Sequence, residues 1–165
     1  MAAAYMYDKH VVKMILESAQ MLCTAHHHYG NGDNVPYKKA HYNHPSTKWC
    51  RENKLQYTWL FRHMLFLGDE YTRRYDPIHL SKQHLTIKKC WDSLCHLPPD
   101  IPDGEFTQPP QCMPDKYKDA CSVKAYWNYY IGEKHSVANK NETIKTNNLF
   151  KHYEQFKKYN PQNMV

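Results

Sequence analysis

Apolar residues recur every three or four positions over long stretches of this chain, and this spacing constrains its fold more than any other feature. In residues 8–26 the series consists of Val11, Ile15, Ala19 and Leu22, flanked by Val12, Leu16 and Cys23. Side chains at this spacing form one face of an α-helix. No stretch shows the alternation of apolar and polar residues that is typical of a half-buried strand. The pattern therefore predicts an all-α fold.

Further segments repeat the helical spacing and end at recognisable stop signals. Residues 54–74 keep it until Asp76 and Pro77, and residues 80–97 keep it until Pro98 and Pro99. We expect the carboxylate of Asp8 to cap the first helix and Ser46 to cap a short helix. Two more helices are predicted, over residues 121–136 and 144–159.

Six prolines fall within residues 98–116, which are expected to form a long loop. A chain of 165 residues fits one ordinary domain. The prediction for residues 1–165 is therefore a compact, single-domain helical bundle with a long Pro-rich loop. Residues 136–165 would contribute a tail helix.

The sequence has no feature that predicts a membrane or secreted protein. No run approaches the roughly 18 to 20 apolar residues that cross a bilayer, and the first residues do not resemble a signal peptide. A cytoplasmic protein without membrane contact is expected. The six cysteines are expected to be free thiols, with Cys23, Cys90 and Cys95 in the core.

The charge of the chain favours an anionic partner. Its formal net charge is +6 and its pI is near 8.9. Nucleic acid leads the possible partners, because fourteen tyrosines and four tryptophans supply rings that stack on bases. The alternative is a lysine excess that only keeps the surface soluble. Surface tyrosines would equally suit a face that joins two copies in a homo-oligomer.

A polar series lies on the first predicted helix, opposite its apolar face. His10, Lys13, Glu17, Gln20 and Thr24 are spaced by three, four, three and four positions, so they share one side. A carboxylate among donors can act as a general acid or base, or it can pair with a lysine four residues away. The alternative interpretation is a solvated helix face with one ion pair.

Histidines and cysteines cluster between residues 23 and 50, but their spacing is not that of a zinc site. Three histidines are consecutive at positions 26–28, and no Cys-x-x-Cys or His-x-x-x-His pair is present. We expect no metal ion and no cofactor. A glycine-rich phosphate loop and the nucleophile elbow of serine hydrolases are also absent from the sequence.

Four segments resemble a family of phage and bacterial proteins similar to pyrimidine dimer DNA glycosylases of the endonuclease V type. The segments are DKHVVKMILESAQ, YNHPSTKWCRENKLQYTWL, GDEYTRRY and AYWNYYIGEK, and the resemblance covers about residues 5–135. Asp8, His10 and Glu17 keep the spacing of an Asp-x-His and of the glutamate seven residues later in that family. The resemblance implies a compact helical domain with Glu17 as the catalytic carboxylate. A phage protein of this kind would act in the cytoplasm of an infected bacterial host.

The resemblance also implies a reaction. Such an enzyme flips a base out of the duplex, attacks the sugar carbon of the damaged nucleotide with an amine and cleaves the strand through a Schiff base. The family's nucleophile is the amino-terminal α-amine, which points to Ala2 after removal of Met1, with Lys9 or Lys13 as substitute amines. His10 joins Glu17 and Ala2 in the expected catalytic set. The expected ligand-binding residues are Lys9, Lys13, Gln20, His44, Arg51, Arg73, Arg74, Tyr126, Trp127, Tyr130 and Lys134.

Two other hypotheses remain open at this point. Seven residues precede Asp8, so the leader that positions the amine in the family is expected to be shortened here. A non-catalytic phage protein would then use the same fold to bind or sequester a nucleotide-like molecule, such as a host immune signal. The third hypothesis is a DNA-binding accessory protein, whose affinity would fall steeply with salt.

Overall fold

The computed structural model describes residues 2–134, and within this range it contains helices and no strand. The all-α prediction is confirmed. Five α-helices form the fold, namely α1 (Asp8–His28), α2 (Pro45–Cys50), α3 (Lys54–Tyr75), α4 (Leu85–Leu94) and α5 (Ser122–Tyr129). Four short helical turns join them, namely η1 (Ala2–Tyr5), η2 (Gly32–Asn34), η3 (Asp115–Tyr117) and the π-helical η4 (Tyr130–Lys134). The helix predicted over residues 144–159 lies outside the described residues.

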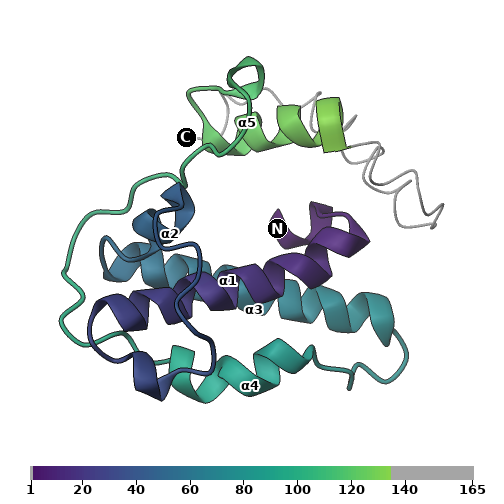
Figure 1. The fold of residues 1–165 in the computed structure, drawn as a ribbon. Helices are drawn as coiled ribbons and strands as arrows, with labels where there is room; N and C mark the ends of the chain where they lie inside the picture. The colour runs from purple at the N-terminus through teal and green to yellow at the C-terminus, as the bar shows by residue number, and fades with distance from the viewer. Residues whose placement is uncertain (1, 135–165) are drawn as a thin grey trace.

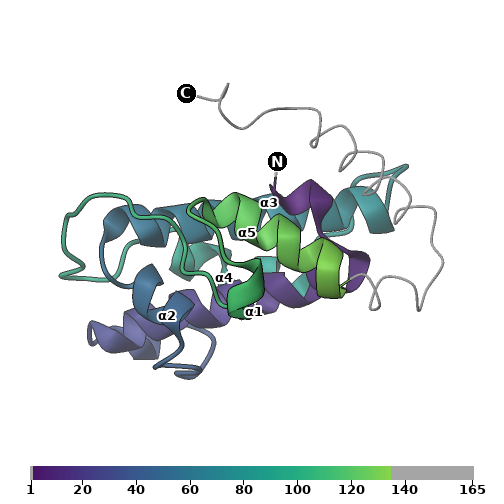
Figure 2. The ribbon, with the colours of Figure 1, turned by 90° about the horizontal axis from the view of Figure 1, so that it is seen from above.

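The long helices α1 and α3 lie side by side and form the centre of the molecule (Figure 1). In the same view α4 lies below this pair, α2 lies at one end and α5 lies above. Seen from above, α5 lies over the pair and is reached through the long loop that follows α4 (Figure 2). The first helix is therefore packed on one side and faces α5 on another.

The apolar series of α1 supplies the centre of the core, as its spacing predicts. Val11, Ile15, Ala19 and Leu22 are all completely buried. They pack with Leu60, Met64 and Leu67 from α3 and with Cys90 and Leu94 from α4. Leu16, at the edge of the series, stays partly exposed. Burial of this face fixes the rotation of α1, so its polar series is directed away from the core.

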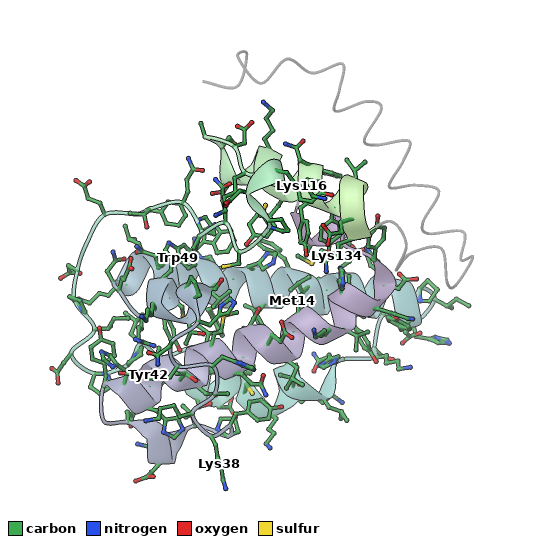
Figure 3. The ribbon with its side chains drawn as sticks, turned by 45° about the horizontal axis from the view of Figure 1, so that its top comes forward. Met14, Lys38, Tyr42, Trp49, Lys116 and Lys134 are labelled. Atoms are coloured by element: carbon green, nitrogen blue, oxygen red, sulfur yellow. The ribbon has the colours of Figure 1, made fainter. Side chains whose placement is uncertain are left out.

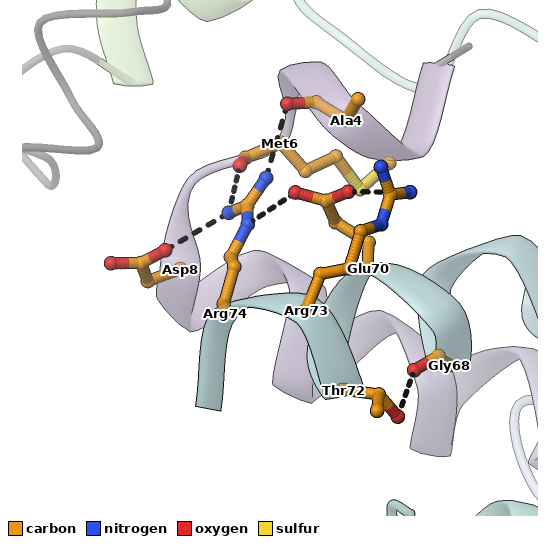
Figure 4. Close-up of polar contacts among 8 residues, drawn as sticks. All are labelled: Ala4, Met6, Asp8, Gly68, Glu70, Thr72, Arg73 and Arg74. Atoms are coloured by element: carbon orange, nitrogen blue, oxygen red, sulfur yellow. Dashed lines mark hydrogen bonds and ion pairs between the residues drawn. The ribbon is translucent and has the colours of Figure 1, made fainter. Parts of the chain in front are cut away.

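The capping prediction for Asp8 is wrong, because its carboxylate is used in an ion pair. Tyr7 is the N-cap residue of α1 and makes no side-chain capping bond. Asp8 Oδ1 instead lies 2.9 Å from Nη1 of Arg74, near the end of α3. Arg74 also donates to Glu70 Oε1 at 2.6 Å and to the carbonyl oxygens of Met6 and Ala4 (Figure 4). One guanidinium thus fastens the start of the chain to α3.

Helix α4 begins five residues later than the apolar spacing predicts. The carboxylate of Asp76 accepts hydrogen bonds from the backbone amides of His79, Ser81 and Lys82, which holds this segment in a turn. Leu80 has a φ of +53°, in the left-handed region that a right-handed helix does not allow. The helix therefore starts only after this turn.

Short helix α2 is capped by a residue other than the predicted one. His44 is the N-cap, and its Nδ1 accepts a hydrogen bond from the amide of Ser46 at 3.2 Å. Pro45 occupies the first helical position, where a missing amide hydrogen costs nothing. Ser46 is therefore inside the helix rather than at its cap.

The Pro-rich stretch forms a loop, as predicted, and side-chain hydrogen bonds order it. Trp49 Nε1 donates to Thr107 Oγ1 at 3.0 Å, and Asn53 Nδ2 donates to the Glu105 carbonyl at 3.0 Å. Ser122 Oγ, at the start of α5, donates to the carbonyl of Pro109 at 2.8 Å. The loop is thus tied to α2 and α3 at one end and to α5 at the other.

All six cysteines are free thiols, as expected. Cys23 and Cys90 are buried in the core, whereas Cys95 is exposed, so its assignment to the core is wrong. Cys95 follows the last residue of α4 as its C-cap. None of the helices formed by residues 2–134 is long and apolar enough to span a membrane.

Candidate functional site

Four polar residues of α1, His10, Lys13, Glu17 and Gln20, form a row that we call the α1 stripe. Lys13 is exposed and the other three are half-buried. Thr24, the fifth member of the predicted series, is completely buried and donates through Oγ1 to the carbonyl of Ala40 at 2.9 Å. The solvent-facing part of the row therefore ends at Gln20, and a loop covers the position after it.

The π-helical turn η4 meets the amino-terminal end of the α1 stripe. Nδ1 of His10 and the hydroxyl of Tyr130 share a hydrogen bond across 120 residues of sequence. The ring of Tyr130 also stacks on that of Tyr7, with centroids 5.1 Å apart and an interplanar angle of 14°. Figure 3 places Lys134 close above α1. These contacts bring Tyr130 and Lys134 to the α1 stripe, and we call this group the α1–η4 site.

Burial and neighbouring charges keep His10 neutral. Burial lowers its pKa, and the charges of Lys134 and Lys13 lower it further, while Glu17 opposes them. Burial raises the pKa of Tyr130, so the phenol keeps its proton. Tyr130 then donates the hydrogen bond to Nδ1 of His10, which leaves Nε2 of the neutral imidazole as a donor.

Glu17 forms an ion pair within the α1 stripe. Its Oε1 lies 3.0 Å from Nζ of Lys13, at the four-residue spacing that favours such pairs. The side chains are 67% exposed for Lys13 and 36% exposed for Glu17, so solvent reaches both partners. An exposed pair of this kind contributes little to stability, at most about 1 kcal/mol. Separation of Glu17 from Lys13 would therefore cost little stability.

The remaining predicted residues divide between three parts of the structure. Lys9 is exposed on the first turn of α1, and Ala2 opens η1, which packs on α3. The hydroxyl of Tyr126 donates to the Pro110 carbonyl at 2.9 Å, so this ring anchors α5 to the Pro-rich loop. Trp127 is half-buried on the same helix.

Two of the predicted arginines, Arg51 and Arg73, lie outside the α1–η4 site, whereas the charge of Arg74 reaches Tyr130. Arg74 is only 9% exposed and its guanidinium is used inside the fold, so we leave it out of the proposed ligand contact. Arg73 pairs with Glu70 at 3.0 Å on the exposed side of α3. Arg51, like the cap residue His44, lies near the carboxyl-terminal end of α1, where Arg51 Nη1 donates to the Tyr42 carbonyl at 2.7 Å.

The sequence pattern does not identify two residues whose contacts bear on the candidate site or on the surface charge. Tyr7 precedes the first helix by one residue, and its contact with Tyr130 spans 123 residues. Tyr42 lies in a segment without helical spacing, yet it carries two cations over its ring. Helical periodicity finds neither residue, because both act through contacts between distant segments.

Two cavities in the described part of the chain lie away from the α1 stripe. One of about 880 Å³ lies between α3 and α4, where Leu65, Ile87 and Trp91 contribute to its lining. The other, of about 700 Å³, is shallow and lies between the Pro-rich loop and the start of α5. Among residues 2–134, no three His, Cys, Asp or Glu side chains gather in a way that could hold a metal ion.

Comparisons with family models, with curated proteins and with solved structures find no match for this chain.

Proposed function

We propose that this protein binds DNA along α1 and excises damaged bases as a DNA glycosylase with an associated strand-cleaving lyase step. The observation that carries the proposal is that Tyr130 and the charge of Lys134 reach His10, on the same side of α1 as the Lys13–Glu17 pair. These groups combine an accessible carboxylate, a neutral imidazole and two ammonium groups. The resemblance to pyrimidine dimer glycosylases supports it, because it assigns the catalytic carboxylate to Glu17.

The cations of the α1–η4 site suit the first event, the binding of a nucleotide. Lys13 is exposed, and the charge of Lys134 reaches His10. Both ammonium groups would attract DNA phosphates. A phosphate on Lys13 would release Glu17 from its ion pair, so binding would make the carboxylate available for chemistry.

The chemical steps need an amine and a carboxylate. The amine attacks C1′ of the damaged nucleotide, the bond from C1′ to the base breaks, and the base leaves with a proton from the site. A proton moves from the amine nitrogen to O4′ as the sugar ring opens, which leaves a protonated Schiff base at C1′. Glu17 then takes a proton from C2′, and the bond from C3′ to the phosphate oxygen breaks. The negative charge of Glu17 also stabilises the cationic intermediate.

Borohydride trapping tests the proposal directly. Incubated with a duplex that carries a pyrimidine dimer and with borohydride, the protein should form a covalent adduct that an undamaged duplex does not give. Mass spectrometry of the adduct should place the DNA on the α-amine of Ala2, as the resemblance implies. Attachment at Lys13 or Lys9 would contradict that assignment while still supporting the lyase reaction.

Absence of an adduct on both dimer-containing and abasic DNA would overturn the enzymatic proposal. The alternative function, sequestration of a nucleotide-like ligand, uses the same cations and Glu17 pair without chemistry. Calorimetric titration with cyclic and linear nucleotide messengers would then show heat of binding. Lack of binding in that titration would exclude the alternative as well.

A further inference from the structure

The segment from residue 36 to residue 51 is a strongly basic surface outside the α1–η4 site. It contains Lys38, Lys39, Lys48 and Arg51 and no aspartate or glutamate. The three lysines are exposed, as are His41 and His44. We call this segment, which runs from the end of η2 through α2, the basic loop.

Hydrogen bonds fix the basic loop against the carboxyl-terminal end of α1. Thr24 Oγ1 accepts from the amide of Ala40 at 3.0 Å and donates to its carbonyl at 2.9 Å. The hydroxyl of Tyr42 bonds to Nδ1 of His28 at 2.7 Å. Because the loop is already ordered, little conformational entropy would be lost when it binds a partner.

Two tyrosine rings of the basic loop hold cations. The guanidinium carbon of Arg51 lies 3.9 Å from the ring centroid of Tyr42, and Nζ of Lys39 lies 5.0 Å from the same centroid. Nζ of Lys89 from α4 lies 4.8 Å from the ring centroid of Tyr37. Cations that lie over these rings are held at the surface with their positive charge. This surface therefore suits phosphates.

The basic loop continues the line of the α1 stripe. Thr24 follows Gln20 at the same helical spacing, and it is the residue to which the loop is bonded. From His10 to Thr24 the helix rises by about 21 Å, which corresponds to roughly six base pairs of duplex DNA. Figure 3 shows Lys134 and Tyr42 over opposite ends of α1, with Met14 between them. A duplex that contacts both sites would have to run along α1 from Lys134 to Tyr42.

We propose that the basic loop binds the phosphate backbone of duplex DNA, independently of base sequence, and holds the duplex along α1. This inference rests on the proposed function, because it assigns a second contact to the same DNA. The α1–η4 site supplies the chemistry, whereas the basic loop supplies affinity. Charges spread along a segment suit a polyanion better than a single free phosphate.

The salt dependence of DNA binding tests this inference. Fluorescence anisotropy with an undamaged duplex of 16 base pairs would be measured for the wild-type protein and for the triple variant K38Q/K39Q/K48Q. Loss of three phosphate contacts should reduce the magnitude of the slope of the logarithm of the association constant against the logarithm of the salt concentration by about 2.7. This reduction in slope should be the same for duplexes of different sequence. These lysines are exposed and the contact of Lys39 with Tyr42 is worth about 0.5 to 1 kcal/mol, so the melting temperature should fall by only a few degrees.

A matched control removes the same charge from another surface. In K54Q/K118Q/K124Q, each lysine is already paired with an aspartate, at 2.9 Å for Asp103, 2.7 Å for Asp115 and 2.8 Å for Asp119. We expect this variant to keep the wild-type slope. Equal slopes for all three proteins would overturn the inference and leave the proposed function standing. No DNA binding by the wild-type protein would overturn the proposed function and this inference together.

Discussion

At the scale of single residues, the position of the chain start depends on the guanidinium of Arg74. It donates to Asp8, to Glu70 and to the carbonyls of Met6 and Ala4. Arg74 and Glu70 are nearly buried, with side chains 9% and 11% exposed. The substitution Arg74→Ala should therefore remove the cation that lies between the carboxylates of Asp8 and Glu70 and lower the free energy of unfolding by about 3 kcal/mol.

Arg73→Ala is the matched control for this prediction in urea denaturation. Arg73 pairs with the same Glu70, but its side chain is 63% exposed. Its loss should cost at most about 1 kcal/mol. Equal losses in the two variants would contradict the structural role given to Arg74.

A second residue-scale prediction concerns His26 and pH. His26 is 1% exposed, and its Nε2 bonds to the hydroxyl of Tyr57 at 2.9 Å. Burial lowers its pKa from 6.5 to about 4, so the unfolded chain binds a proton more readily than the folded one. The stability that neutral His26 contributes is therefore fully present above pH 6.5 and is lost as the pH drops toward 4. Between pH 7 and pH 5 this residue alone should remove about 2 kcal/mol from the free energy of unfolding.

Denaturation of His26→Gln at several pH values checks this prediction. The variant should start less stable at pH 7 but lose less stability on acidification than the wild-type protein. Parallel pH profiles for the two proteins would show that His26 does not cause the loss.

At the scale of elements, the Pro-rich loop and α3 depend on each other through Asn53. Its Oδ1 accepts from the amide of Leu55 at 2.9 Å and thereby caps α3, while Nδ2 binds the loop. A Cβ on Gly104 would lie 2.5 Å from this Nδ2. The substitution Gly104→Ala should push Asn53 away from its capping position and cost about 1 kcal/mol.

A double-mutant cycle tests this coupling by urea denaturation. If Gly104→Ala acts through Asn53, then N53A/G104A should be no less stable than Asn53→Ala alone. Additive losses would mean that Gly104→Ala destabilises the loop by a route independent of the cap.

The attachment of α5 is a second element-scale property. Its contact with α1 runs through η4, where Tyr130 bonds to His10 and stacks on Tyr7. Tyr130→Ala should raise amide hydrogen exchange in α5 and η4 while α1, α3 and α4 keep their protection. Tyr126→Phe, which removes only the bond to Pro110, should have a smaller effect. Uniform exchange changes across the molecule would contradict a local attachment.

At the scale of the whole molecule, helical periodicity was sufficient for the buried face of α1 but not for the whole core, since Leu55 and Trp91 are exposed whereas Tyr57 is buried. Val11, Ile15, Ala19 and Leu22 are buried as their spacing predicts. The periodicity also placed His10, Lys13 and Glu17 on one side of α1. It could not place Tyr130 on His10 or the basic loop on Thr24, because both are contacts between distant segments. The turn at Leu80 depends on side-chain acceptors from Asp76 that override apolar spacing.

The whole molecule thus presents α1 as a single line that connects two cationic sites. The α1–η4 site lies toward its amino-terminal end, and the basic loop is bonded to Thr24 near its other end. The central proposal is that DNA lies along this line and that Glu17 performs chemistry on it. A substitution can separate DNA binding from the chemical step. Glu17→Gln removes the negative charge of the carboxylate while keeping the size of the side chain.

The most direct test compares borohydride trapping and DNA affinity in the wild-type protein, Glu17→Gln and the control Glu105→Gln. Glu105 is an exposed residue of the Pro-rich loop. Glu17→Gln should bind the dimer-containing duplex at least as tightly as the wild-type protein, yet form adduct about 100-fold or more slowly. Glu105→Gln should match the wild-type protein in both measurements. Equal trapping by the wild-type protein and Glu17→Gln would contradict the account.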